Sequence, residues 1–195
     1  MTSPLLKALA LFEGPVDLLL SLIGVHEFLP STEFLANVGG SLCSDTSITQ
    51  FLCTNSLFVL CGFNINQMNT ELLPVIMGHT PAGSSVGQFV HYAQSIKTGK
   101  FRQYDYGLVK NLFVYKSIHP PKYDLSKVTA PVALFYSRND WLSAQVDVLK
   151  LYGELSNPIG RFVVTDGLFN HLDYMWGKDA DTIVYNKIFA LMNKY

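Results

Sequence analysis

The sequence predicts an α/β fold in which a helical region precedes a short parallel sheet. Three observations support this prediction: the first 118 residues have mainly helical or irregular patterns, the prolines of "HPPKYDLSKVTAP" interrupt them, and the remainder alternates strand, helix, strand, helix. Consecutive prolines exclude helix and favour an extended chain. We therefore expect a helical region at 1–118 and a strand-containing region at 119–195.

Two segments of the first region have apolar residues at helical spacing, "LLPVIMGH" and "SVGQFVHYAQSIKTG". The second is expected to begin at a serine N-cap and to end at Gly99. The residues of its apolar face are Val86, Phe89, Val90, Ala93 and Ile96.

The second region begins with "VALFY" (132–136), whose residues are all apolar, as in a parallel strand covered on both faces. "SAQVDVLKLYGEL" (143–155) predicts a helix with Ser143 as a candidate N-cap. "RFVVT" (161–165) predicts the second strand, and 180–195 the last helix. A parallel sheet of only these strands would leave its faces and edges uncovered, so we expect a partial α/β domain.

The composition limits the partners of the chain. Of its 195 residues 49% are hydrophobic and 15% charged, the formal net charge is -1, and Lys and Arg form no run, which argues against nucleic acid. An apolar partner fits better. No segment reaches the roughly 18–20 uncharged apolar residues of a transmembrane helix, and the first residues lack a convincing signal peptide.

An acid and a histidine follow the two expected strands. Asp140 ends "SRND" after the first strand, and His171 lies in "GLFNHLDYMWG" after the second. Catalytic groups gather at the carboxyl ends of parallel strands, and an acid followed by a histidine is the order of the second half of an α/β-hydrolase triad. Asp166 is a competing acid, closer to His171 in sequence, and Asp173 fits a turn or helix start. We expect Trp141 and Trp176 to pack beside the site.

The serine nucleophile of such an enzyme lies at a Gly-X-Ser-X-Gly turn between a strand and a helix. "AGSSVGQ" places Ser84 and Ser85 near glycines, but we expect no strand before them. We interpret these serines as the N-cap of the following helix and expect the nucleophile to lie outside this sequence.

Four segments resemble the acid lipases, the family of gastric lipase, lysosomal acid lipase and their insect relatives. They are "LCTNSLFVLCGFN", "GHTPAGSSVGQFVHYAQSIKTGKFRQYDYG", "PPKYDLSKVTAPVALFYSRNDWLS" and "FNHLDYMWGKDADTIVYNKI". The resemblance implies that Asp140 is the triad acid, that His171 is the triad base, and that 1–118 forms a helical cap shaping an apolar acyl-binding cleft. It also implies a C-terminal portion of the α/β-hydrolase fold without the nucleophile half, since no Gly-His-Ser-X-Gly is present.

The three cysteines are Cys43, Cys53 and Cys61. The first two close a short loop, and Cys61 fits a buried small hydrophobe. The resemblance implies a disulfide between Cys43 and Cys53 with Cys61 unpaired. It further implies a secreted or lysosomal protein that needs no metal or organic cofactor and cleaves carboxylic esters of lipids, with peripheral contact to a lipid interface.

We therefore expect a lipid ester hydrolase of the Ser-His-Asp type whose isolated 195-residue chain is inactive. One alternative is a non-catalytic lipid-binding module or truncated isoform. Another is an ester or epoxide hydrolase from a different α/β branch.

Overall fold

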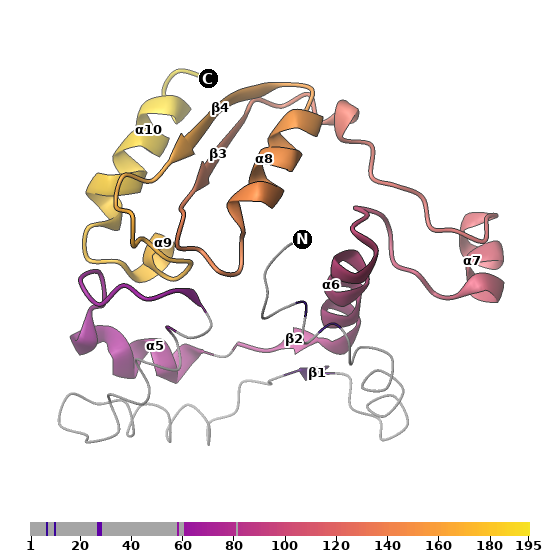
Figure 1. The fold of residues 1–195 in the computed structure, drawn as a ribbon, viewed down its shortest axis with the longest axis horizontal. Helices are drawn as coiled ribbons and strands as arrows, with labels where there is room; N and C mark the ends of the chain where they lie inside the picture. Colours follow the sequence, from indigo (N-terminus) through magenta and orange to yellow (C-terminus); the bar gives the residue numbers. More distant parts are fainter. Residues whose placement is uncertain (1–6, 8–9, 11–26, 29–57, 59–60, 81) are drawn as a thin grey trace.

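A computed structural model describes residues 7, 10, 27–28, 58, 61–80 and 82–195 (Figure 1). Cys43 and Cys53 lie outside these residues, as does almost half of the expected helical region at 1–118. The elements are β1 (Glu27–Phe28), η1 (Thr70–Leu72), α5 (Leu73–His79), β2 (Ser84–Ser85), α6 (Val86–Thr98), α7 (Leu108–Tyr115), η2 (Leu125–Lys127), β3 (Val132–Tyr136), α8 (Gln145–Glu154), β4 (Pro158–Val163), α9 (Asp173–Trp176), η3 (Asp181–Tyr185) and α10 (Asn186–Met192).

The strands β3 and β4 pair in parallel, which confirms the expected sheet. β3 has the predicted bounds, whereas β4 begins and ends earlier than the predicted 161–165. The hydrogen bonds between the strands explain the early start. The Val132 amide donates to the Asn157 carbonyl (3.0 Å), so pairing with β3 begins before the predicted residues 161–165. Pro158 is tolerated because it is the first residue of its strand.

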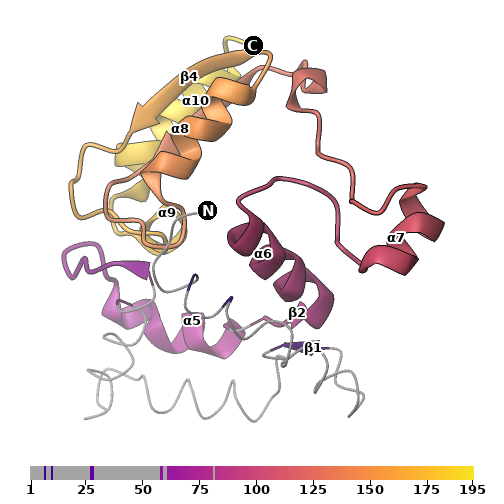
Figure 2. The ribbon, with the colours of Figure 1, turned by 45° about the vertical axis from the view of Figure 1, so that its right-hand side comes forward.

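Helices lie on both faces of this sheet, α8 on one and α10 on the other (Figures 1 and 2). On the α10 face, Val164, Phe169, Ala180 and Val184 form a buried cluster against Phe135 of β3. These two helices cover both faces of β3, as the sequence predicts, although every residue of the strand is only half-buried. Two strands with one helix on each face provide too little surface to bury β3 completely.

Both expected helices of the first region form. In α6, the residues Val86, Val90 and Ala93 are buried, and Gly99 ends the helix in the left-handed conformation (φ 64°). Residues Phe58, Met68 and Leu73 form a second buried cluster at α5.

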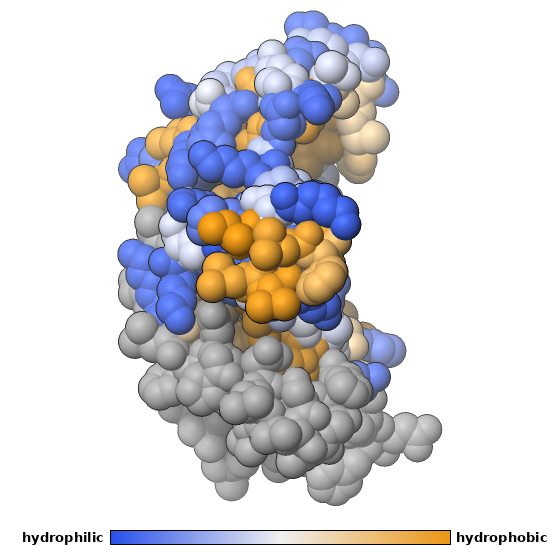
Figure 3. Space-filling view, turned by 90° about the vertical axis from the view of Figure 1, so that its right-hand side faces the viewer, coloured by the Kyte–Doolittle hydropathy of each residue, from blue (hydrophilic) through white to orange (hydrophobic). Residues whose placement is uncertain are grey.

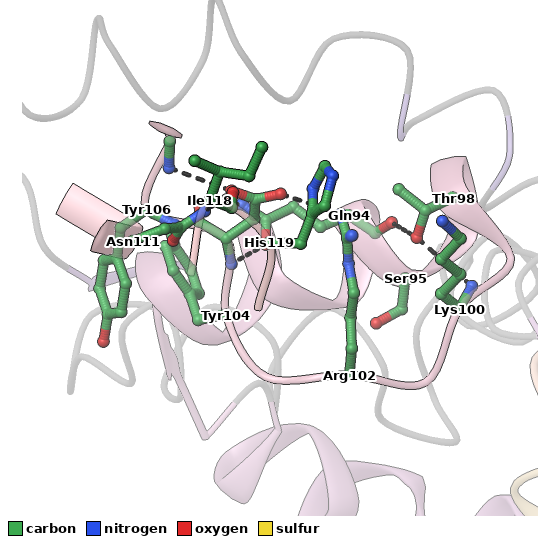
Figure 4. Close-up of polar contacts among 12 residues, drawn as sticks. Gln94, Ser95, Thr98, Lys100, Arg102, Tyr104, Tyr106, Asn111, Ile118 and His119 are labelled. Carbon is green, nitrogen blue, oxygen red and sulfur yellow. Dashed lines mark hydrogen bonds and ion pairs between the residues drawn. The ribbon is translucent and has the colours of Figure 1, made fainter. Parts of the chain in front are cut away.

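The helix α7 lacked a predicted counterpart, and a polar network determines its orientation (Figure 4). The Gln94 side chain of α6 brackets Asp105, donating to its carbonyl and accepting from its amide, both at 2.9 Å. The Asp105 carboxylate accepts from Arg102 (2.9 Å) and Asn111 (2.8 Å). Burial opposes its ionisation, but the hydrogen bonds from Asn111 and Gly107 and the Arg102 charge hold the pKa of Asp105 below its usual value. Asn111 is therefore the buried residue of α7. Most apolar side chains of the helix are exposed.

Two further boundaries differ from prediction. The helix α8 begins at Gln145 with Ala144 as its N-cap, so the assignment of Ser143 as N-cap is wrong. The amide of Ser143 instead donates to Asp140 Oδ1 (2.7 Å), which makes Ser143 part of the preceding loop. The predicted last helix contains a π-helical turn, η3, before α10.

Candidate active site

Asp140 and His171 meet at the carboxyl end of the sheet. Asp140 lies in the loop after β3 and His171 in the loop after β4, and the ring Nδ1 is 2.9 Å from Asp140 Oδ2. The carboxylate is buried, with 5% of its side chain exposed, while the imidazole is 43% exposed. Among the described residues, no hydrogen bond is made to the other ring nitrogen, Nε2.

The orientation of Asp140 follows from its own loop. Its second oxygen, Oδ1, accepts from the amides of Leu142 (2.9 Å) and Ser143 (2.7 Å). These bonds leave Oδ2 directed at the imidazole. An acceptor carboxylate at Nδ1 favours the tautomer with the proton on Nδ1 and the lone pair on Nε2.

The same contact tunes the acidity of the ring. The hydrogen bond to Asp140 raises the pKa of His171, burial opposes this, and the Asp140 charge adds to the rise. The protonated form of the His171 ring is therefore stabilised by its carboxylate partner. Nearby, burial together with the Asp140 and Asp173 charges raises the pKa of Cys61 to about 11, so its thiol stays neutral at ordinary pH.

The backbone of Cys61 connects the two loops. Its carbonyl accepts from the amides of both Trp141 and His171, each at 3.4 Å. Cys61 itself is buried and unpaired, as the sequence predicts for a small hydrophobe. Asn139, beside the acid, donates to the carbonyls of Phe63 (2.9 Å) and Leu168 (2.6 Å), which adds a second connection.

Among the described contacts, the other residues singled out from the sequence make no hydrogen bond to the imidazole. Asp166 does not meet the imidazole; its Oδ1 accepts from the Leu168 amide (2.9 Å), as in a turn. Asp173 is the first residue of α9, as expected for a helix start. Trp141 lies edge-on to Phe63, with ring centroids 5.8 Å apart, and remains 42% exposed.

The serines before α6 form a helix cap. Residues 83–87 read Gly-Ser-Ser-Val-Gly and fit the literal Gly-X-Ser-X-Gly pattern with Ser85 at its centre. Ser85 Oγ, however, accepts from the Gln88 amide (3.0 Å), and the Gln88 side chain completes a capping box. The backbone of Ser85 is ordinary extended chain (φ -69°, ψ 142°), unlike the strained turn of a nucleophile elbow. The predicted N-cap is confirmed.

A cavity of about 360 Å³ lies between α6, α8 and the chain that follows α7. Its apolar lining includes Phe101, Tyr123 and Leu151, and its lining residues include neither Asp140 nor His171. The acyl-binding cleft that the resemblance implies stays a prediction. Within the described residues, no cluster of His, Cys, Asp or Glu is arranged to hold a metal ion. No helix in that part of the chain has the length and hydropathy needed to cross a bilayer.

Sequence reasoning missed the segment that joins the two loops. Cys61, Gly62 and Asn64 precede α5, far from both strands in sequence, and carry no pattern typical of a catalytic group. Their contacts with the acid and histidine loops arise from chain folding over long separations. The only available signal was the segment "LCTNSLFVLCGFN" within the family resemblance.

Comparison with known proteins identifies relatives over the whole chain. It is 37% identical over 195 residues to lipase 3 of Drosophila melanogaster, covering 100% of this chain and 50% of the relative. It is 37% identical over 195 residues to human lysosomal acid lipase/cholesteryl ester hydrolase, covering 47% of that protein. Over 179 residues, 91% of this chain, it is 37% identical to gastric triacylglycerol lipase of Rattus norvegicus, covering 45% of that lipase. The chain thus spans about half the length of these relatives, and no family model matches it.

Proposed function

Because the chain belongs to the acid lipase family, we propose that it supplies the acid and the base of a lipid carboxylic ester hydrolase. The substrates are triacylglycerols or sterol esters, in keeping with the names of the gastric and lysosomal relatives. The observation that carries the proposal is the hydrogen bond between His171 Nδ1 and the buried Asp140 carboxylate.

The chemistry follows from this pair. His171 Nε2 removes the proton of a serine hydroxyl as the hydroxyl attacks the ester carbonyl, and returns it to the departing alcohol. Water then attacks the acyl-serine: His171 removes a proton from the water and returns a proton to the serine oxygen, which releases the fatty acid. Asp140 holds the ring tautomer and stabilises the imidazolium without itself becoming protonated.

The serine is proposed to come from a Gly-His-Ser-X-Gly turn that this sequence does not contain. In this arrangement 119–195 forms the last part of an α/β-hydrolase sheet and 1–118 forms the cap. Cys43 and Cys53 are proposed to form a disulfide in the cap, in a secreted or lysosomal protein. The reaction requires no metal or organic cofactor.

A chimera tests the proposal. The matched half of Drosophila melanogaster lipase 3 is replaced by this chain, so that the remaining half of the relative supplies the nucleophile. We expect ester hydrolysis that falls by at least about 10³-fold in the His171→Gln and Asp140→Asn variants. A folded chimera whose activity is unaffected by His171→Gln would refute the assignment of His171 as base.

The isolated chain gives a second test. We expect no turnover of short- or long-chain esters and no labelling by a fluorophosphonate, since residual catalysis without a nucleophile is small. Ester turnover that His171→Ala abolishes would show that the nucleophile lies within these 195 residues. Retention of fatty acid without turnover in the chimera would favour the non-catalytic lipid-binding alternative.

We propose that α7 makes the peripheral contact with the lipid interface. Its exposed apolar side chains are Leu108, Val109, Leu112, Phe113 and Val114. Figure 3, which faces the side of the molecule where α7 lies, shows an apolar patch bordered by hydrophilic residues. The segment 106–123 contains three lysines and no acidic residue, so the patch is suited to a neutral or anionic lipid surface.

Co-sedimentation with phosphatidylcholine-coated triolein droplets tests this contact. Phe113 is 74% exposed, and Phe113→Ser should release a large share of bound chain from the droplets. Phe189→Ser on α10 is the matched control, since Phe189 is 57% exposed outside the patch. Equal losses for both variants would contradict a contact specific to α7.

A further inference from the structure

We infer that Asn64 is a positioning residue for His171, acting through the carboxylates of the histidine loop. The inference rests on the proposed function, since it concerns the group proposed there as the base. Asn64 lies ahead of α5, 107 positions before His171, and touches neither the imidazole nor Asp140 in the contacts of the described residues.

Two hydrogen bonds carry the inference. The Asn64 side-chain amide, Nδ2, donates to Asp173 Oδ2 at 2.8 Å and to Asp166 Oδ2 at 3.3 Å. These carboxylates lie on either side of His171 in sequence. Asn64 is 1% exposed and Asp173 is 3% exposed, so the first bond is shielded from water. One neutral amide therefore joins both ends of the loop that presents the imidazole.

Asn170 transmits this constraint to its neighbour His171. The backbone amide of Asn170 donates to Asp173 Oδ2 (2.8 Å), which also accepts from the Asn64 side chain. In return, Asn170 Oδ1 accepts from the amides of Leu172 (2.8 Å) and Asp173 (3.1 Å), and its Nδ2 donates to the Gly62 carbonyl (3.0 Å). The residues before and after the histidine are thus both fixed to the segment containing Asn64.

The charges explain why an amide is required at this position. Burial raises the pKa of Asp173, hydrogen bonds from Asn170 and Asn64 oppose that rise, and the charge of Asp166 adds to it. Without the Asn64 amide, the negative charges of Asp166 and Asp173 would lose a shared hydrogen-bond donor. Their repulsion would then move the loop so that the two carboxylates separate. Such relaxation would move His171 away from Asp140.

A purely structural role for Asn64 makes a different prediction. In that case its removal lowers the free energy of unfolding but leaves the His171–Asp140 hydrogen bond intact in the folded chain. A readout at the imidazole separates the two roles, and it needs no catalysis.

The experiment is NMR of the 195-residue chain labelled with ¹⁵N-histidine, with His171 assigned through His171→Gln. In Asn64→Ala we expect loss of the downfield Nδ1–H resonance and a fall in the His171 pKa toward its value in Asp140→Asn. Asn66→Ala is the matched control: Asn66 is an exposed asparagine of the same segment, and both signals should stay as in the parent chain. Asn64→Ser, a smaller change, replaces Asn64→Ala if that variant does not fold.

The outcomes distinguish the inference from the proposed function. A folded Asn64 variant with the parent resonance and the parent His171 pKa would overturn the inference, whatever its stability. If Asp140→Asn also leaves both signals unchanged, the proposed acid–base pair itself fails. A change in Asp140→Asn and in the Asn64 variant, but not in Asn66→Ala, supports both.

Discussion

His171 Nδ1 and Asp140 Oδ2 lie 2.9 Å apart although 31 positions separate the two residues in the chain. Parallel pairing of β3 with β4 brings their loops to one edge of the sheet. The contact has a consequence for stability as well as for the proposed chemistry, because it raises the pKa of His171.

The first prediction concerns pH. Folding raises the His171 pKa, so the folded chain holds this proton more tightly than the unfolded chain, whose histidine titrates near 6.5. The stabilisation is fully present below that pH and is lost as pH rises through the folded pKa. Urea unfolding between about pH 5 and 9 should therefore show a decline in stability that Asp140→Asn largely removes.

His79→Gln is the control for this pH series, since His79 is exposed and lies outside the site. Its pH profile should parallel that of the parent chain. Parallel profiles for Asp140→Asn and the parent chain would show that the imidazole gains no stabilisation from the carboxylate.

The second prediction concerns Gly62. Its φ is +111°, and a Cβ added there would lie 2.1 Å from the carbonyl oxygen of Asn139. The Asn139 backbone can move away only at a cost in free energy, and alanine is also strained at this φ. Gly62→Ala should therefore lower the free energy of unfolding by roughly 3 kcal/mol. Gly78→Ala in α5, with no atom within 4 Å of its added Cβ, should be neutral or slightly stabilising. Chemical denaturation compares the two, and equal stability would contradict the close approach.

The third prediction concerns the core beneath the histidine loop. Phe169 is fully buried and lies edge-on to Tyr174, with ring centroids 5.0 Å apart. Phe169→Ala should cost about 3–5 kcal/mol by leaving a cavity in this cluster. Phe189→Ala, at an exposed phenylalanine of α10, should change stability by less than about 1 kcal/mol. Thermal unfolding monitored by circular dichroism gives both values, and similar losses would indicate that the cluster is not tightly packed.

The fourth prediction concerns Ser85. Loss of its cap on α6 should lower the free energy of unfolding by about 1 kcal/mol in Ser85→Ala. Ser84→Ala should have a smaller effect, because Ser84 Oγ bonds only exposed groups. In the lipase 3 chimera, hydrolysis by Ser85→Ala should match the parent chimera at temperatures where both are folded. Abolished hydrolysis with intact folding would make Ser85 a nucleophile and would refute its assignment as a cap.

The sequence by itself determined the local elements. The unbroken apolar run of β3, the apolar face of α6 and its serine and glycine ends appear where their patterns predict them, because each depends on neighbours a few residues away. The order of acid and histidine after consecutive strands indicated Asp140 and His171, because parallel strands place their carboxyl ends together.

Only the tertiary structure decided what holds the pair in place. The choice of Asp140 over Asp166 as partner of the imidazole, the carbonyl of Cys61 between the two loops and the amide of Asn64 across two carboxylates all depend on contacts between distant parts of the chain. The outward apolar face of α7 has the same origin, since the buried position of Asn111 is fixed by Asp105 and not by the hydropathy of the helix. The spacing of apolar residues predicts which side of a helix or strand is buried. A single buried hydrogen bond between side chains far apart in the chain produces no such pattern in the sequence.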